Sequence, residues 1–294
     1  MQSATYEPKL IPQKSVLGEA PVWDAVAAKL NWVDCDQRQM FRLDPETGEI
    51  RTFGLAGQPG SYAFCDDGRI LIAYRTGLAL VDIESSAQQV IETPMVDFAT
   101  TRFNDGACDR AGRFWLGTMH KGMSEPVGAL YRVDPDLSIR QMAGDVTVSN
   151  GIAFSPDDKI MYHTDSRPAV IYAYDFDLQS GTISNRRVFA DFGGRQERPD
   201  GCTVDRDGNL WTAMLGGARV AVLNPKGEEI RSVPLPATRP TSVCFGGRDL
   251  DTLYVTSMTF SLSEEELAAQ PDAGNVFAFP GIGRGLAEPR FGSG

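Results

Sequence analysis

The amino-acid sequence predicts an all-β protein, a six-bladed β-propeller whose four-stranded antiparallel blades surround a central channel. Three observations predict it. A unit made of a Gly- or Asp-containing turn and a hydrophobic strand occurs six times along the chain. Asp-Pro, Asn-Pro or x-Gly sequences, which are typical of hairpins, follow several of these units. The units recur every 41 to 50 residues, as propeller blades do.

The first strand of each unit begins near a polar residue. These positions are 42, 43, 46, 50 and 41 residues apart: Glu19, Ser61, Asn104, Asn150, Asp200 and Thr241. Four of them lie in Pro- or Gly-containing motifs that we expect to form turns just before the strand: 18–21, 102–106, 149–151 and 198–201. A polar side chain at the mouth of a strand can reach a ligand instead of the core.

The remaining strands follow in order within each unit. We expect the second strands within the segments 28–33, 67–72, 111–116, 158–162, 207–211 and 250–255. Hairpin turns are expected at the ends of 41–48, 130–135, 174–181 and 222–227. A strand over 6–11 is expected to join the last blade, which would otherwise expose an edge. One short helix is expected over 263–270, with Ser263 as its N-cap.

Length, charge and cysteine content narrow the class of protein. A repeat architecture can hold all 294 residues, so we expect a single domain over 1–294. The net charge of −11 disfavours nucleic acid and anionic membranes as partners. No apolar run reaches the roughly 20 residues that span a bilayer, and the N-terminus does not resemble a secretory signal. Five scattered cysteines without a Cys-x-x-Cys motif suggest buried thiols, and hence a cytoplasmic protein. The oligomeric state is left open.

Equivalent positions on the innermost strands of a propeller converge near its axis. Glu19, Asn104, Asn150 and Asp200 hold that position in four of the six blades. Two carboxylates and two amide oxygens form a hard-oxygen site that suits Ca²⁺, Mg²⁺ or Mn²⁺. The alternative is that all four are turn and cap residues, since Asn and Asp before Gly are common in turns. Their shared register at the blade period favours the metal site.

Eight ordered motifs resemble the senescence-marker-protein/gluconolactonase/luciferin-regenerating family. They occupy residues 18–23, 102–106, 117–119, 128–132, 149–151, 184–187, 199–201 and 244–247, and the resemblance extends to 270–274. It implies a six-bladed propeller that hydrolyses sugar-acid lactones in carbohydrate catabolism with one divalent metal ion, which is left open among Ca²⁺, Mg²⁺, Mn²⁺, Zn²⁺ and Fe²⁺. It also implies metal ligands at Glu19, Asn150 and Asp200, and substrate-binding residues at Arg102 and Asn104.

These residue types suit lactone hydrolysis. A divalent cation supplies Lewis acidity and lowers the pKa of bound water. Asp200 is the expected general base, taking a proton from the attacking water and delivering it to the ring oxygen. Arg102 and Asn104 would hold substrate hydroxyls, and the guanidinium would also stabilise the anionic intermediate.

The chain departs from the family pattern after Met119. The regucalcin-like members carry an acidic, substrate-contacting residue there, whereas this chain has His120 and Lys121. We expect both to bind substrate at the channel mouth, where Lys121 would favour an anionic substituent such as a 6-sulfonate or 6-phosphate on gluconolactone. Arg75 and Arg167 follow second strands in the same way and complete a candidate cationic rim; solvated surface charge is the alternative.

Other interpretations stay open. His163 either lines the mouth or is a buried histidine at a strand end, and the chain contains no His-x-His or His-x-x-x-His motif of a zinc hydrolase. A non-catalytic calcium-binding propeller and an aryl-ester or organophosphate hydrolase are the alternative functions. The lactonase is preferred because Arg102 and Asn104 would orient a polyol but add nothing to a bare ion site.

Overall fold

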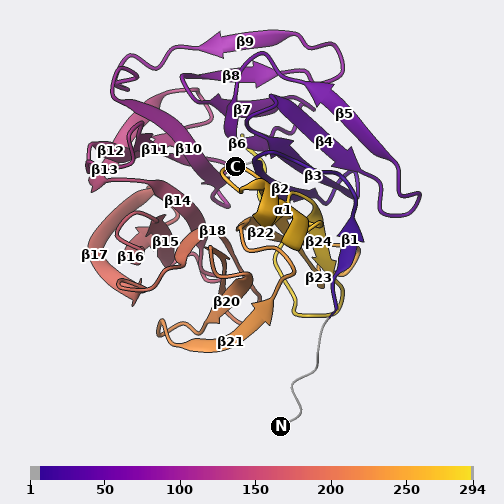
Figure 1. Cartoon of the computed structure of the whole chain (residues 1–294). Helices are drawn as coiled ribbons and strands as arrows, with labels where there is room; N and C mark the ends of the chain where they lie inside the picture. Colours follow the sequence, from indigo (N-terminus) through magenta and orange to yellow (C-terminus); the bar gives the residue numbers. More distant parts are fainter. Residues whose placement is uncertain (1–6, 293–294) are drawn as a thin grey trace.

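The computed structural model describes residues 7–292 and arranges their strands in six four-stranded antiparallel sheets around a central axis (Figure 1). In blades 1 to 5 the strands follow the chain order from the axis outwards. This confirms the all-β six-bladed propeller predicted from the period of the sequence.

We number the blades 1 to 6 in the chain order of their inner strands. Each blade has an inner, a second, a third and an outer strand, counted from the axis to the rim, and the strands below are given from blade 1 to blade 6. The inner strands are β2 (Gly18–Asp24), β6 (Pro59–Phe64), β10 (Thr101–Cys108), β14 (Ser149–Phe154), β18 (Arg198–Val204) and β22 (Pro240–Gly246). The second strands are β3 (Lys29–Asp34), β7 (Ile70–Tyr74), β11 (Phe114–His120), β15 (Ile160–Asp165), β19 (Leu210–Leu215) and β23 (Thr252–Ser257). The third strands are β4 (Gln39–Leu43), β8 (Gly77–Val81), β12 (Gly128–Val133), β16 (Val170–Asp177), β20 (Arg219–Leu223) and β24 (Val276–Phe279). The outer strands are β5 (Ile50–Gly54), β9 (Gln88–Ile91), β13 (Ile139–Val146), β17 (Thr182–Asp191), β21 (Glu229–Pro234) and β1 (Lys9–Ile11).

The N-terminal strand closes the ring as expected. β1 pairs antiparallel with β24, so that Leu10 lies opposite Phe277 at the outer edge of the last blade. The strand is shorter than the expected 6–11, and Tyr6 lies outside the described residues. Each inner strand contacts the inner strands of both neighbouring blades, including β22 with β2.

The hydrophobic core is divided among the blade interfaces. Each of six buried clusters combines side chains of two neighbouring blades. Between blades 3 and 4, for example, the Trp115 ring lies 6.1 Å from that of Phe154 and 5.8 Å from that of Phe176. Burial of apolar surface therefore holds neighbouring blades together. The hydrophobic clusters do not occupy the central axis, where polar side chains can be placed.

In blades 3 and 5 the motif Asp-x-x-Gly-x-x-Trp forms a turn around a buried aspartate. Asp109 accepts hydrogen bonds from the backbone of Ala111 and from Trp115 Nε1, at 3.0 and 2.8 Å. Asp205 accepts equivalent bonds from Asp207 and Trp211 Nε1, at 3.0 and 2.8 Å. The carboxylate thus satisfies both the turn and the indole of the second strand.

The motifs at the start of the inner strands are β-bulges, so the expectation that they are turns before the strands is wrong. The pairing of each inner strand with its neighbour shifts register here, as between Glu19 and Val22 or Asn150 and Ile152. Bulges use the same Gly and Pro residues as turns, and they redirect side chains. Gly60 shows the crowding: a Cβ there would lie 2.3 Å from the Asn104 carbonyl oxygen.

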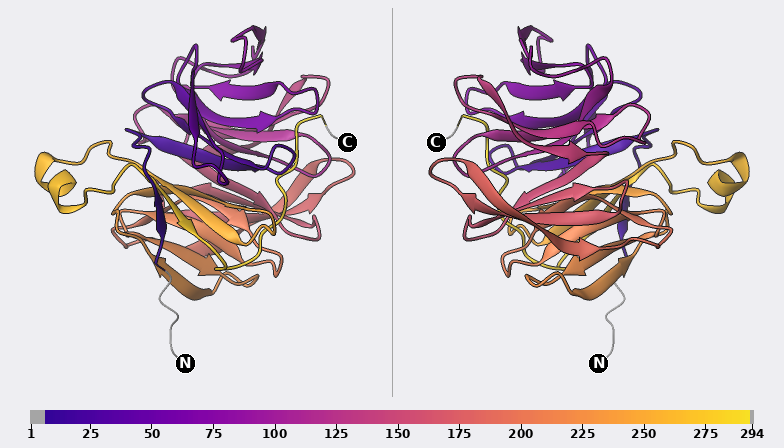
Figure 2. Two further views of the ribbon diagram at one scale, coloured as in Figure 1. Left: turned by 90° about the vertical axis from the view of Figure 1, so that its right-hand side faces the viewer. Right: turned by 90° about the vertical axis from the view of Figure 1, so that its left-hand side faces the viewer.

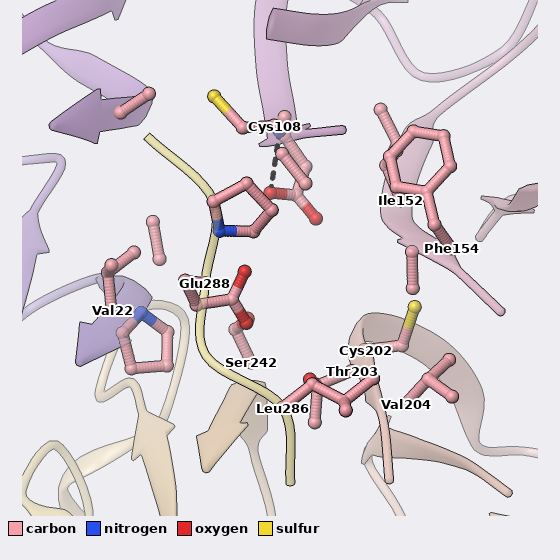
Figure 3. A pocket seen from close by; sticks show the side chains of 18 of the residues that line it. Val22, Cys108, Ile152, Phe154, Cys202, Thr203, Val204, Ser242, Leu286 and Glu288 are labelled. Atoms are coloured by element: carbon pink, nitrogen blue, oxygen red, sulfur yellow. Dashed lines mark hydrogen bonds between the residues drawn. The ribbon is translucent and has the colours of Figure 1, made fainter. Parts of the chain in front are cut away.

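The two faces of the propeller differ. Helix α1 (Glu264–Ala269), capped by Ser263 as expected, projects from one face, and the C-terminal segment crosses the other (Figure 2). The segment 284–292, which we call the strap, is anchored by Gly285 N–H to Leu250 O at 2.8 Å and by Phe291 N–H to Phe64 O at 2.8 Å. Figure 3 shows the strap carrying Leu286 and Glu288 along a cavity of about 90 Å³.

The cysteine side chains are thiols, as expected. All five are free, four of them buried and Cys202 partly buried. Within residues 7–292, no helix is long and apolar enough to cross a bilayer.

Candidate functional site

The candidate site lies at the bulged ends of the inner strands, on the face from which α1 projects. A small cavity of about 20 Å³ there has six polar lining residues: Glu19, Arg75, Arg102, Asn104, Asp105 and Asn150. That volume holds one water-sized ligand or an ion. The inner strands of blades 1, 3 and 4 therefore bring four of the sequence-predicted site residues together.

Asn104 and Asn150 form a hydrogen-bonded chain across neighbouring blades. Asn104 Nδ2 donates to Asn150 Oδ1 at 2.6 Å and to the Ser149 carbonyl at 2.8 Å. Asn150 Nδ2 donates to Ser166 Oγ at 2.9 Å, and Ser166 Oγ donates to the Pro199 carbonyl at 2.6 Å. The hydrogen bond from Asn150 Nδ2 to Ser166 fixes the orientation of the Asn150 amide, so that its oxygen faces Asn104 and the channel.

Glu19 and Asp200 are carboxylates in need of a counter-charge. Burial raises the pKa of Glu19 well above its ordinary value, and repulsion from Asp200 and Asp105 adds to this. Burial, followed by repulsion from Asp105, likewise raises the pKa of Asp200. Asp200 Oδ1 is buried and has no hydrogen-bond partner in the part of the chain that the structure describes. A cation at this point would satisfy the orphaned oxygen and relieve the repulsion.

The donor set fits a hard divalent cation. Among the described residues, no three His, Cys, Asp or Glu side chains gather as a metal cluster, so the set depends on the Asn150 amide oxygen beside the two carboxylates. Carboxylate and amide oxygens are the ligands of Ca²⁺, Mg²⁺ and Mn²⁺. Glu19, Asn150 and Asp200 therefore fit the metal that the resemblance implies.

Arg102 lies against this oxygen set. Its Nη1 donates to Asn104 Oδ1 at 2.7 Å and to the Phe103 carbonyl at 3.1 Å. Burial and then the neighbouring Arg75 lower the pKa of Arg102 to about 10, so the guanidinium stays charged at neutral pH. A held, charged donor at the channel mouth can bind an oxygen-rich ligand.

His120 and Lys121 are not brought together with these residues, and neither lines the cavity. His120 Nδ1 accepts the backbone N–H groups of Ser124 and Glu125, at 3.3 and 3.1 Å. Lys121 Nζ donates to the carbonyls of Phe98 and Ala99, at 2.5 and 3.2 Å. Their contact with substrate stays a prediction.

Two residues of this site were missed or undervalued by sequence reasoning. Asp105 lines the cavity, and burial raises its pKa to about 6. It stands in the same motif as Asn104, but the turn interpretation assigned one ligand to each blade. Arg75 also lines the cavity, although the sequence placed it only in a weak cationic rim.

His163 is the buried histidine rather than a mouth residue. It is fully buried in β15, and its Nε2 lies 2.8 Å from Ser149 Oγ. Burial lowers the pKa of His163 to about 3, so the imidazole is neutral at physiological pH.

Comparison with known proteins shows the family to which this chain belongs. The family model described as SMP-30/Gluconolactonase/LRE-like region matches residues 17–259. The chain belongs to this family. It is 41% identical to the 6-deoxy-6-sulfogluconolactonase of Pseudomonas putida, covering 96% of this chain and 97% of the relative. It is 34% identical to human regucalcin over 95% of each chain. The structure of a calcium-binding protein, regucalcin, from Agrobacterium tumefaciens superposes with a TM-score of 0.93 at 26% identity, covering 98% of this chain and 99% of that one.

Proposed function

We propose that this protein opens the ring of a sugar-acid lactone by hydrolysis, with one divalent cation held by Glu19, Asn150 and Asp200. By homology it is a gluconolactonase-like lactonase. The observation that carries the metal site is the orphaned, buried Asp200 Oδ1 among repelling carboxylates at the channel mouth. Arg102 lines the same cavity as Glu19 and Asn150 and can bind substrate, which a site that only holds an ion does not need.

The chain's own residues account for the remaining chemistry. The cation supplies Lewis acidity and lowers the pKa of bound water. Asp200 accepts the proton of the attacking water and returns it to the ring oxygen as the ester opens. Arg102 binds a substrate hydroxyl and stabilises the negative charge that develops on the carbonyl oxygen. Asn104 orients both Arg102 and Asn150, and the second lone pair of its Oδ1 can accept a substrate hydroxyl.

The proposed substrate is a gluconolactone that carries an anionic group at C6. The Pseudomonas putida relative is named for a 6-sulfonated gluconolactone and matches nearly the whole chain. Two guanidinium groups, Arg75 and Arg102, line the cavity of a protein whose net charge is −11. Guanidinium groups can bind an anionic substituent of the substrate through charge-assisted hydrogen bonds.

A panel of lactones tests the proposal. Protein stripped of metal and reloaded with Ca²⁺, Mg²⁺, Mn²⁺ or Zn²⁺ would be assayed by a pH indicator against gluconolactone, its 6-phosphate and its 6-sulfonate. We expect metal-dependent acid release, fastest with a 6-anionic substrate. Metal binding without hydrolysis of any lactone would instead support the non-catalytic calcium-binding propeller.

A further inference from the structure

We propose that Arg75 is a binding subsite for the tetrahedral anionic group of the substrate, a sulfonate or phosphate, beside the lactone site. This inference rests on the proposed function. It also replaces Lys121 by Arg75 as the favoured recognition residue for that group.

The backbone places Arg75 firmly against the site. Arg75 directly follows β7, and its N–H donates to the Gln58 carbonyl at 2.8 Å. Its own carbonyl accepts the Phe103 N–H at 3.0 Å, next to Arg102. Blade 2 is thereby tied to the bulge of blade 3, and both arginines line the same cavity as Glu19.

The Arg75 guanidinium lacks an anionic partner. Its Nη1 donates to Gln58 Oε1 at 2.8 Å, whereas its Nε is buried without a hydrogen-bond partner. Within residues 7–292, no carboxylate lies within ion-pair distance of Arg75. Arg219, by contrast, contacts Glu197 and Glu229 at 2.6 and 2.5 Å. A buried donor and an uncompensated charge are costly unless a ligand completes them.

The other two rim cations are less suited to this role. Lys121 already donates to two backbone carbonyls and does not line the cavity. Arg167 is exposed. Arg75 is therefore the rim cation that faces the site, and it lies close enough to Arg102 for the two charges to repel. An anion placed between them relieves that repulsion.

The free donor also has the geometry for a tetrahedral oxyanion. A guanidinium presents Nε–H and Nη–H groups in a rigid planar fork, which matches two oxygens of a phosphate or sulfonate. Gln58 holds Nη1 and leaves Nε–H for the ligand. A neutral hydroxymethyl group at C6 would satisfy Nε but would not neutralise the charge.

The test compares Arg75→Gln with Arg75→Lys, Lys121→Gln and Arg167→Gln on gluconolactone and on its 6-phosphate and 6-sulfonate, with kcat and KM measured separately. We expect Arg75→Gln to lower the kcat/KM ratio of anionic to neutral substrate by roughly 10- to 100-fold, mainly through KM. Arg75→Lys should recover part of the ratio. The effect should shrink as salt is raised. Arg167→Gln should leave the ratio unchanged.

Two outcomes would overturn the inference: an equal loss on all substrates, or a selective loss that follows Lys121→Gln instead of Arg75→Gln. A second measurement separates it from the proposed function. Inorganic sulfate or phosphate should raise the Tm of the metal-loaded wild type more than that of Arg75→Gln. If no lactone is hydrolysed but this difference is found, the subsite stands and the lactonase proposal fails; if both proteins respond equally, the subsite fails.

Discussion

Asn104 connects the proposed substrate residue to the proposed metal site. Its Oδ1 accepts from Arg102 and its Nδ2 donates to Asn150 Oδ1. One amide therefore sets the orientation of a charged donor and of a neutral metal ligand. At this scale the site is a network of positioned groups, and single substitutions should separate their tasks.

Arg102→Ala should separate substrate handling from metal binding. Because Arg102 is proposed to stabilise the developing oxyanion, its loss should lower kcat/KM for gluconolactone by roughly 100-fold. Cation affinity should change little, since the Asn150 amide is also held by Ser166. Parallel activity assays and calorimetric metal titrations would check this. A loss of metal affinity as large as that of Asp200→Asn would refute the division of tasks.

Sequence spacing could predict Glu19, Asn104, Asn150 and Asp200, because residues one blade apart in sequence occupy equivalent places around the axis. It could not select Asp105 or Arg75. The bulge between Phe103 and Gly106 decides that Asp105 also faces the cavity, and that bulge depends on pairing with β11. Arg75 is directed by its contact with Gln58, a residue in the loop between β5 and β6.

At the scale of the strand, the bulges place the site. Pro-Asp-Gly and Asn-Gly are also typical of turns, so the local sequence alone does not distinguish a turn from a bulge. The partner strand decides, and it comes later in the chain. Gly151 shows what the bulge requires: its φ is +37°, and a Cβ there would lie 2.6 Å from the Asp200 carbonyl oxygen.

Gly151→Ala should therefore destabilise the fold and weaken the metal site together. Gly48→Ala is the matched control, because Gly48 has a φ of +78° but open space around it. We expect the control to lose about 1 kcal/mol from the unfavourable φ, and Gly151→Ala to lose about 2–4 kcal/mol because the clash adds to it. Urea unfolding of the two variants measures both losses of stability. Equal losses would mean that the bulge tolerates a side chain.

The strap introduces a partly buried acid, Glu288, on the opposite face. Burial raises the pKa of Glu288 to about 7, and the charge of Arg110, which also pairs with Asp158, opposes this rise. Asp105 lines the same cavity. The folded state thus holds the Glu288 proton more tightly than the unfolded chain, where a glutamate has a pKa of about 4.3.

Glu288→Gln should consequently alter how stability depends on pH. Ionising Glu288 costs the folded wild type nothing below about pH 4, a growing amount up to about pH 7, and a constant amount above. Relative to the wild type, the variant should gain about 1–3 kcal/mol between pH 5 and pH 8, the lower value applying if water enters the cavity. Urea unfolding at the two pH values would show it. Parallel stability curves would contradict the buried, proton-holding carboxyl.

At the scale of the whole molecule, the blade period made the six-bladed ring and its closure by β1 predictable. The strap was not predictable, since 284–292 has neither strand alternation nor a repeat partner and is held by contacts to blades 2, 3, 5 and 6. The proposed metal ligands likewise come from blades 1, 4 and 5, so only the closed ring would assemble them.

Calorimetric titration of metal-stripped protein with Ca²⁺, Mg²⁺ and Mn²⁺ tests this assembly most directly. The wild type should bind at least one of these cations at a single site. Glu19→Gln and Asp200→Asn, which keep side-chain size but remove a charge, should each weaken binding at least 10- to 100-fold, the loss already seen when groups behind a ligand are changed. Arg167→Gln, an exposed change on the same face, should leave it intact. Binding by Asp200→Asn as tight as that of the wild type would contradict a metal centre at the convergence of the inner strands.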